Sequence, residues 1–370
     1  MKKLTTILLF VAAFSLSAQV FEDQALKRLV KRGADHIYNA DPDSAYFYIN
    51  QIGEKLPEHP VVPLMTAMTM LWSNIPTITE ELFLQMQDQL LYAIELAEIR
   101  DPDLDDPEMV FFAMASHGLL AEYYADQDYN LRAVGEANKA YGLMKKGFKI
   151  VDTHSEFLFT TGLYNYFREK YPEKHPIYKP LLWFFRSGDI ELGLKQLEEA
   201  CEVAVLSQVE AYVYLSYIYL RYEYKPKKAQ EYLGTIIEKY PNNFYAKGKY
   251  LESLANPQDF EKAPIEIIYS LMHHENLYYK LAGYVFLGYY EEMIIGSNEK
   301  AEFAYRQGLL YGDEITHHGE YFKGLGYLGL GRILALKGKK EEAREKLNLA
   351  IKFAETEQIR RDARELLAGL

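Results

Sequence analysis

The sequence has little cysteine, proline and basic charge. It contains one cysteine, Cys201, and 14 prolines in 370 residues. A single cysteine cannot form an intramolecular disulfide, so the fold must be stabilised by a large apolar core, in which we expect Cys201 to lie buried. Lys and Arg number 41 against 53 Asp and Glu, which gives a net charge of −12. This balance argues against nucleic-acid binding, because a nucleic-acid partner requires a basic surface.

The first 18 residues have the pattern of a secretory signal peptide. Lys2 and Lys3 precede an apolar run at 4–14, and small residues at 15–18 precede Gln19. The run is too short to span a bilayer, which disfavours the alternative of an uncleaved anchor. A lipoprotein would need a cysteine directly after this run. We expect a mature chain without a transmembrane segment that is periplasmic or secreted, with peripheral contact to the outer membrane left open.

Residues 327–351 read as two helices separated by a tight glycine turn. An alanine marks the second helix of this unit, and similar alanines occur earlier in the chain. They stand at intervals of 34, 38 and 42 residues, at Ala229, Ala263, Ala301 and Ala343. Repetition at such a period is the signature of a helical solenoid.

The C-terminal unit resembles the tetratricopeptide repeat (TPR) family. The slots of the family pattern are filled, in order, by Tyr327, Leu330, Gly331, Leu334, Ala343, Leu347 and Ala350. The segment 161–194 departs from the pattern. It resembles the middle of uncharacterised bacterial TPR proteins and, distantly, the TPR 39/mitochondrial outer-membrane family. The resemblance implies an all-α fold, a right-handed TPR-like solenoid of antiparallel helix pairs with an irregular helical middle segment.

Four regions follow from this interpretation. They are the signal peptide at 1–18, degenerate helical repeats at 19–147, the irregular helical segment at 148–192, and TPR-like repeats at 193–370. The last three form one continuous solenoid. The tyrosine-rich run at 210–224 has β-favouring residues, but its length and tyrosine spacing predict the first helix of the repeat that contains Ala229.

Motifs for cofactors and metals are weak in this chain. The stretch 324–329 spells GxGxxG, but no strand precedes it, so we interpret its glycines as helix-packing residues. The acidic loop 101–108 lacks the glycine and glutamate of an EF-hand, and an irregular calcium site there is the less favoured alternative. Adjacent histidines, at 273–274 and 317–318, diverge by 100° on a helix and cannot chelate one metal ion unless they stand in a loop. We predict no cofactor, no metal site and no catalytic residue.

The resemblance implies that certain repeat positions line a concave groove. The candidate groove residues are Tyr217, Arg221, Tyr245, Glu252, Tyr289, Glu292 and Arg332. Tyrosine and arginine suit such a surface because they give large contact area and directed hydrogen bonds. The apolar run 177–185 is expected in the core, with membrane or partner docking as the alternative.

The leading hypothesis is an exported, non-enzymatic scaffold that holds a protein or peptide in a tyrosine-rich groove, in the periplasm of a Gram-negative bacterium. The alternative is a glycan or small-ligand binding protein of the bacterial envelope, and an enzyme comes third. A contiguous tyrosine-lined groove with mixed charge would favour the first hypothesis. A closed pocket with paired acids would favour the other two, but the sequence cannot locate such a pair, because its signature is a distance in space.

Overall fold

The computed structural model describes residues 19–174, 176, 185–255, 259–315 and 318–370, and within them the protein is all-α. About 79% of these residues are helical and none forms a strand, which confirms the predicted fold class. Of the apolar run 177–185 only Phe185 lies within the described residues, and of the histidine pair 317–318 only His318 does. No described helix has both the length and the apolar character needed to cross a membrane.

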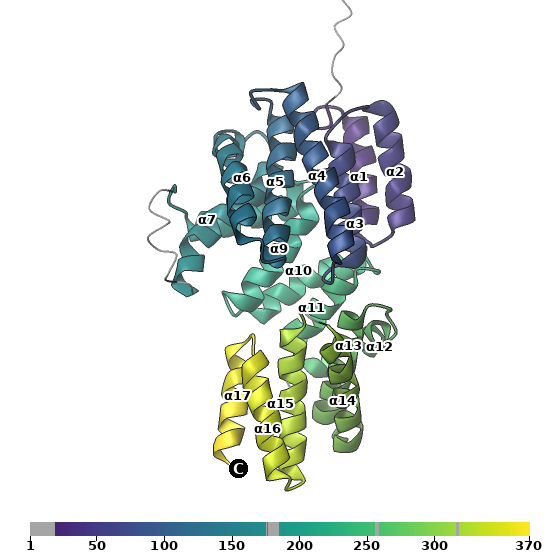
Figure 1. Cartoon of the computed structure of the whole chain (residues 1–370), viewed down its shortest axis with the longest axis vertical. Helices are drawn as coiled ribbons and strands as arrows, with labels where there is room; N and C mark the ends of the chain where they lie inside the picture. Colours follow the sequence, from purple (N-terminus) through teal and green to yellow (C-terminus); the bar gives the residue numbers. More distant parts are fainter. Residues whose placement is uncertain (1–18, 175, 177–184, 256–258, 316–317) are drawn as a thin grey trace, which may run out of the picture.

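Seventeen α-helices make up the described part of the chain (Figure 1). The first nine are α1 (Gln24–Tyr38), α2 (Pro42–Lys55), α3 (Val61–Asn74), α4 (Glu80–Arg100), α5 (Pro107–Asp126), α6 (Asn130–Ile150), α7 (Phe157–Lys174), α8 (Ile190–Val203) and α9 (Gln208–Arg221). The others are α10 (Pro226–Lys239), α11 (Phe244–Leu254), α12 (Ile265–Met272), α13 (Leu277–Tyr290), α14 (Asn298–Glu314), α15 (Glu320–Leu336), α16 (Lys340–Phe353) and α17 (Glu357–Ala368).

Consecutive helices pack as pairs, from α1 with α2 to α15 with α16, and α17 packs on the last pair. The second helix of several pairs presents a fully buried alanine, as at Ala229, Ala301 and Ala343. These three repeat markers are therefore confirmed. The fourth is wrong, because Ala263 lies in the short connection between a 3₁₀ turn at Phe260–Lys262 and α12. Pro264, the N-cap residue of α12, interrupts the expected second helix.

Local sequence explains where several helices begin. Asp41 accepts a hydrogen bond from the backbone N–H of Ser44 at 3.3 Å, and proline occupies the first position of α2. Asp106 caps α5 in the same way, accepting from the N–H of Glu108 at 2.9 Å. Aspartate at the N-cap followed by proline is a strong helix start, since neither residue requires an intrahelical hydrogen bond there.

The GxGxxG stretch lies inside α15, where its glycines permit close helix packing. A Cβ atom added to Gly329 would stand 2.3 Å from the ring of Tyr305, and one added to Gly331 would stand 2.5 Å from the side chain of Leu347. Neither position tolerates a side chain without movement. The motif is therefore a packing device of the repeat, as we expected, and not a phosphate-binding loop.

The tyrosine-rich run forms α9, which confirms the helical interpretation but not its full length. The helix ends at Arg221, and Tyr224 adopts a left-handed conformation with φ of 52°. The following connection leads into α10, whose Tyr232 stacks on Tyr219 with ring centroids 5.9 Å apart.

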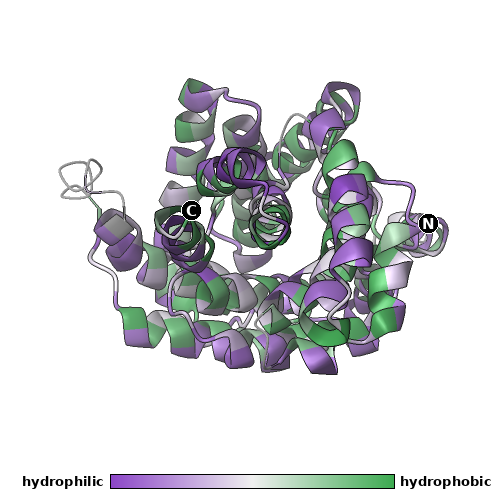
Figure 2. Cartoon of the chain, turned by 90° about the horizontal axis from the view of Figure 1, so that it is seen from below, coloured by the Kyte–Doolittle hydropathy of each residue, from purple (hydrophilic) through white to green (hydrophobic). Residues whose placement is uncertain are grey.

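The solenoid curves so that its first and middle helices meet. The phenol of Tyr38 donates to the carbonyl of Leu206 at 3.0 Å, and the amide of Asn243 donates to the carbonyl of Tyr38 at 2.9 Å. Farther along, the phenol of Tyr279 donates to the carbonyl of Ile75 at 2.7 Å. Seen along the long axis, the helices follow a curved path (Figure 2). These contacts join segments about 170 to 205 residues apart.

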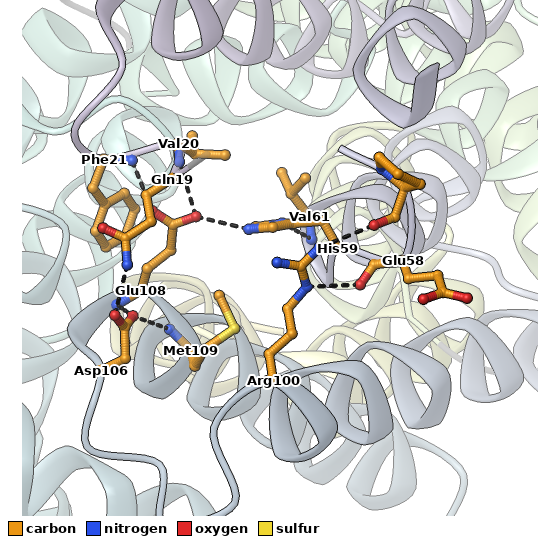
Figure 3. A network of polar contacts seen from close by, with 11 residues as sticks. Gln19, Val20, Phe21, Glu58, His59, Val61, Arg100, Asp106, Glu108 and Met109 are labelled. Carbon is orange, nitrogen blue, oxygen red and sulfur yellow. Dashed lines mark hydrogen bonds and ion pairs between the residues drawn. The ribbon is translucent and has the colours of Figure 1, made fainter. Parts of the chain in front are cut away.

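Residues 19–21 are held against the start of α5 (Figure 3). The buried carboxylate of Glu108 accepts from the backbone N–H groups of Val20 and Phe21 at 2.9 and 2.8 Å. His59 Nε2 lies 2.8 Å from the same carboxylate. The side chain of Gln19 donates to Asp106 at 2.7 Å. These contacts hold residues 19–21 on the first turn of α5.

Candidate binding site on the inner helices

A cavity of about 390 Å³ lies between α3, α5, α6, α7 and α9 in the N-terminal half. Four of these are the first helices of successive pairs, the helices expected to face the concave side of a solenoid. The lining is dominated by aliphatic, aromatic and methionine side chains. It includes Leu64, Met65, Met68, Phe111, Phe112, Met114, Leu119, Met144, Phe159, Leu163 and Phe167. Volume and lining are those of a small-molecule site.

The cavity arises because one stripe of α5 combines large side chains with small ones. Phe111, Ala115, Gly118 and Glu122 follow the spacing of a single helix face, and all four line the cavity. A Cβ atom added to Gly118 would meet nothing within 4 Å. The space therefore exists where Ala115 and Gly118 fail to fill the gap between opposing helices.

Two carboxylates, Glu122 of α5 and Glu210 of α9, belong to the lining. The phenol of Tyr214 donates to Glu122 Oε2 at 3.2 Å. Glu210 Oε1 accepts from the indole N–H of Trp72 at 3.2 Å and from the phenol of Tyr38 at 3.4 Å. The polar part of the site is thus built from acidic groups and neutral hydrogen-bond donors.

Desolvation by the surrounding helices raises the pKa of Glu122 to about 7, and the charge of Asp126 raises it further, although Glu122 keeps an exposed edge towards solvent. Burial likewise raises the pKa of Glu210 to about 7, with a further contribution from Glu122. The hydrogen bonds from Tyr214 and Trp72 oppose these shifts without cancelling them. Near neutral pH, each carboxyl group is poised between its protonated and ionised forms.

Glu210→Gln should stabilise the protein more at pH 8 than at pH 4.5. Because the pKa of Glu210 rises from 4.5 in the unfolded chain to about 7 in the fold, the native state binds more protons in this window. The contribution of Glu210 to the free energy of unfolding is therefore fully present below pH 4.5 and is lost as the pH rises through 7. Removing the charge should recover about 3 kcal/mol at pH 8 and little at pH 4.5.

Urea unfolding at the two pH values measures this difference. Glu95→Gln, at an exposed position of α4, is the matched control and should change stability by less than about 0.5 kcal/mol at both pH values. A Glu210→Gln effect that is the same at pH 4.5 and pH 8 would show that this carboxyl group does not titrate as described.

The structure brings three of the predicted groove residues together in the second half of the molecule. Arg221 forms ion pairs with Glu252 and, at 3.1 Å, with Glu355. Glu252 also pairs with Lys249 at 3.1 Å, and the ammonium group of Lys249 lies 5.7 Å from the ring centroid of Tyr245. Burial alone would raise the pKa of Glu252, but the charges of Arg221 and Lys249 outweigh it and lower that pKa.

Glu292 and Arg332 form a separate pair. Arg332 donates to the two oxygens of Glu292 at 2.8 and 2.9 Å, and the phenol of Tyr305 donates to Glu292 at 2.7 Å. The Glu292 side chain is 7% exposed. The four charged residues predicted to face a partner, Arg221 included, are therefore engaged in ion pairs within the chain.

The two tyrosines placed in the same groove slot differ in the structure. Tyr217 is 42% exposed, as a groove position requires. Tyr289 is 4% exposed and packs edge-on against Phe260, with centroids 4.8 Å apart. The prediction of a groove-facing Tyr289 is therefore corrected, because the 3₁₀ turn that replaces the expected helix around Ala263 places Phe260 over its ring.

Sequence reasoning missed Glu122 and Glu210. Glu122 stands on the apolar stripe of α5 and Glu210 opens the tyrosine-rich run, so each interrupts a pattern that otherwise reads as core. A carboxylate on an otherwise apolar helix face was the available signal. It could not show that the two residues, 88 positions apart, share one cavity.

No protein-family model matches the chain, and no curated protein matches its sequence. Among solved structures, the chain is similar to a signal transduction ATPase with numerous domains (STAND) protein with a tetratricopeptide repeat sensor from Pyrococcus horikoshii. The identity is 14% and the TM-score 0.38, over 86% of this chain and 54% of that one. The chain thus spans about half of that protein's length. Its own helices define the class, a helical-repeat protein with an apolar cavity between its inner helices.

Proposed function

We propose that this protein is an exported, non-enzymatic binding protein that holds the apolar part of a small ligand in the cavity. The observation that carries the proposal is the 390 Å³ apolar cavity with two carboxylates in its lining. A pocket with two acids in its lining favours small-ligand binding over a tyrosine-lined groove. A glycan fits less well, since its hydroxyl groups would meet mainly aliphatic and aromatic side chains.

A protein or peptide partner is the second candidate. It is favoured by the exposed ring of Tyr217 on α9, a first helix of the solenoid. A tyrosine in this position provides contact area with few rotatable bonds. Such a partner would lie along the inner helices and place an apolar side chain in the same cavity.

The carboxylate pair is suited to binding. Two acidic side chains in an otherwise apolar lining can hold a positive or hydrogen-bond-donating group of a ligand.

The export part of the proposal predicts a mature N-terminus near Gln19. The short apolar run at 4–14 motivates it, and the hydrogen bonds of Val20 and Phe21 to Glu108 support it, because they hold the residues directly after the expected cleavage point on α5. N-terminal sequencing of the protein from envelope fractions should find Gln19, and detergent should not be needed for release. Recovery of Met1 on the exported protein would contradict the prediction.

The cavity can be filled without disturbing its walls. Gly118→Leu places a side chain where a Cβ meets nothing, and it should also stabilise α5 by up to about 1 kcal/mol. Gly135→Leu on α6 is the matched control, because its Cβ also meets nothing within 4 Å and the residue does not line the cavity.

Native mass spectrometry of the protein purified from envelope extracts tests the function. We expect a small molecule to accompany the wild type and Gly135→Leu, and to be absent from Gly118→Leu. Equal recovery of the molecule with both variants would refute binding in the cavity. If the wild type instead binds another protein, and Gly118→Leu does not, the result supports the second candidate, a protein or peptide partner.

A further inference from the structure

The cavity carboxylates differ from the other inner carboxylates in their surroundings. Glu252 faces Arg221 and Lys249, and Glu292 faces Arg332. Within the described residues, by contrast, no lysine, arginine or histidine pairs with Glu122 or Glu210 or shifts its titration. Two acids that share a cavity without a counter-charge leave a place for a cation.

The groups around the pair come from four helices and are acidic or neutral. Asp126 and Tyr123 stand on α5 beside Glu122, and Tyr214 of α9 hydrogen-bonds to it. Around Glu210 are Trp72 of α3 and Tyr38 of α1. Phenols and an indole donate hydrogen bonds but carry no positive charge at neutral pH.

The carboxylates of Glu122 and Glu210 can accept further hydrogen bonds. Among the described residues, Glu210 Oε1 receives both hydrogen bonds, from Trp72 and Tyr38, and Glu210 Oε2 receives none. Glu122 accepts from one phenol only, although a carboxylate can accept about four hydrogen bonds. An ammonium group offers three donors, so it could bond to both carboxylates while its apolar substituent fills the cavity.

We propose that the cavity selects small ligands with an apolar body and a protonated primary amine, and that Glu122 and Glu210 hold the amine. This inference rests on the proposed function and names the chemical class of its ligand. An anionic head group would be repelled by the two acids and by Asp126. An uncharged head group would gain one or two neutral hydrogen bonds in place of charge-assisted ones, which are about twice as strong.

Decylammonium, 1-decanol and decanoate serve as probes, since they share one apolar chain and differ in the head group. Isothermal titration of the mature protein at pH 7.5 should show decylammonium binding at least about 10-fold more tightly than 1-decanol, with decanoate weakest. Decylammonium should bind about 10-fold more weakly at pH 5, where the carboxyl groups are protonated. Equal affinities for decylammonium and 1-decanol would overturn the inference.

Isosteric variants assign the effect to the two acids. Glu122→Gln and Glu210→Gln should each weaken decylammonium binding by roughly 10- to 100-fold and change 1-decanol binding by less than about 3-fold. Glu95→Gln should leave both affinities unchanged, and thermal unfolding checks that each variant is folded. Unchanged decylammonium affinity in both cavity variants would overturn the assignment.

Gly118→Leu separates failure of the inference from failure of the proposed function. If it abolishes binding of decylammonium and 1-decanol alike while the two bind equally to the wild type, the cavity is the site and the amine preference is wrong. If it leaves both affinities unchanged, the probes do not enter the cavity, and both proposals fall.

Discussion

Replacing Glu252 with alanine should destabilise the protein by about 3 to 5 kcal/mol. The Glu252 side chain is 2% exposed and forms ion pairs with Arg221 and Lys249. Its removal leaves Lys249, whose side chain is only 19% exposed, without the carboxylate it pairs with, and Arg221 keeps Glu355. An unpaired buried charge costs far more than an exposed pair contributes. Urea unfolding at pH 7 measures the loss.

Glu341→Ala provides the matched control. Glu341 is 86% exposed and pairs with Arg344 at 3.1 Å, so its removal should cost less than about 1 kcal/mol. The contribution of Glu252 should also fade as pH falls through its lowered pKa, because protonation removes the charge. Similar, small losses in Glu252→Ala and Glu341→Ala would mean that the inner ion pairs are solvated and contribute little.

The second large effect is expected from the buried tyrosines. Tyr219→Ala and Tyr289→Ala should each cost about 3 to 5 kcal/mol through lost apolar burial and the void left behind. The two rings are 2% and 4% exposed. Tyr217→Ala, on the same helix as Tyr219 but 42% exposed, should cost less than about 1 kcal/mol. Thermal and urea unfolding of the three variants side by side measures the contrast.

Tyr217 and Tyr219 form a matched pair because they differ by two positions on one helix. If Tyr217→Ala strongly destabilised the protein and Tyr219→Ala did not, α9 would have to be rotated so that Tyr217, and not Tyr219, faces the core. If Tyr289→Ala left the stability unchanged, Tyr289 would not be a core residue, and the groove position that the repeat pattern predicts would be correct.

Sequence predicted the parts of this fold that are encoded locally. Aspartate followed by proline fixes the starts of α2 and α5, and small residues mark helix contacts at Ala229 and Ala343. Both signals act within one or two turns of the chain, so a repeat pattern captures them. The same pattern failed at Ala263, where a single proline changed the connection.

The candidate site was not predictable in this way. Its cavity depends on what α5 leaves unfilled opposite α7 and α9, and therefore on the packing of side chains distant in sequence. Tyr289 could not be placed from the sequence for the same reason. Tyr217 and Tyr289 occupy the same position in two repeats, but only the ring of Tyr289 is covered, by Phe260. The charges of Arg221 and Glu252 suggested a partner surface, because sequence does not reveal that adjacent repeats neutralise each other.

Site-specific photo-crosslinking tests the central claim that the cavity between the inner helices is the binding site. A photoreactive phenylalanine analogue at Leu119, in the cavity lining, is compared with the same analogue at Leu131, which is 92% exposed on α6. Irradiation in envelope extracts followed by mass spectrometry should find a ligand adduct at position 119 and none at 131. Adducts at 131 alone, or equally at both positions, would contradict the account.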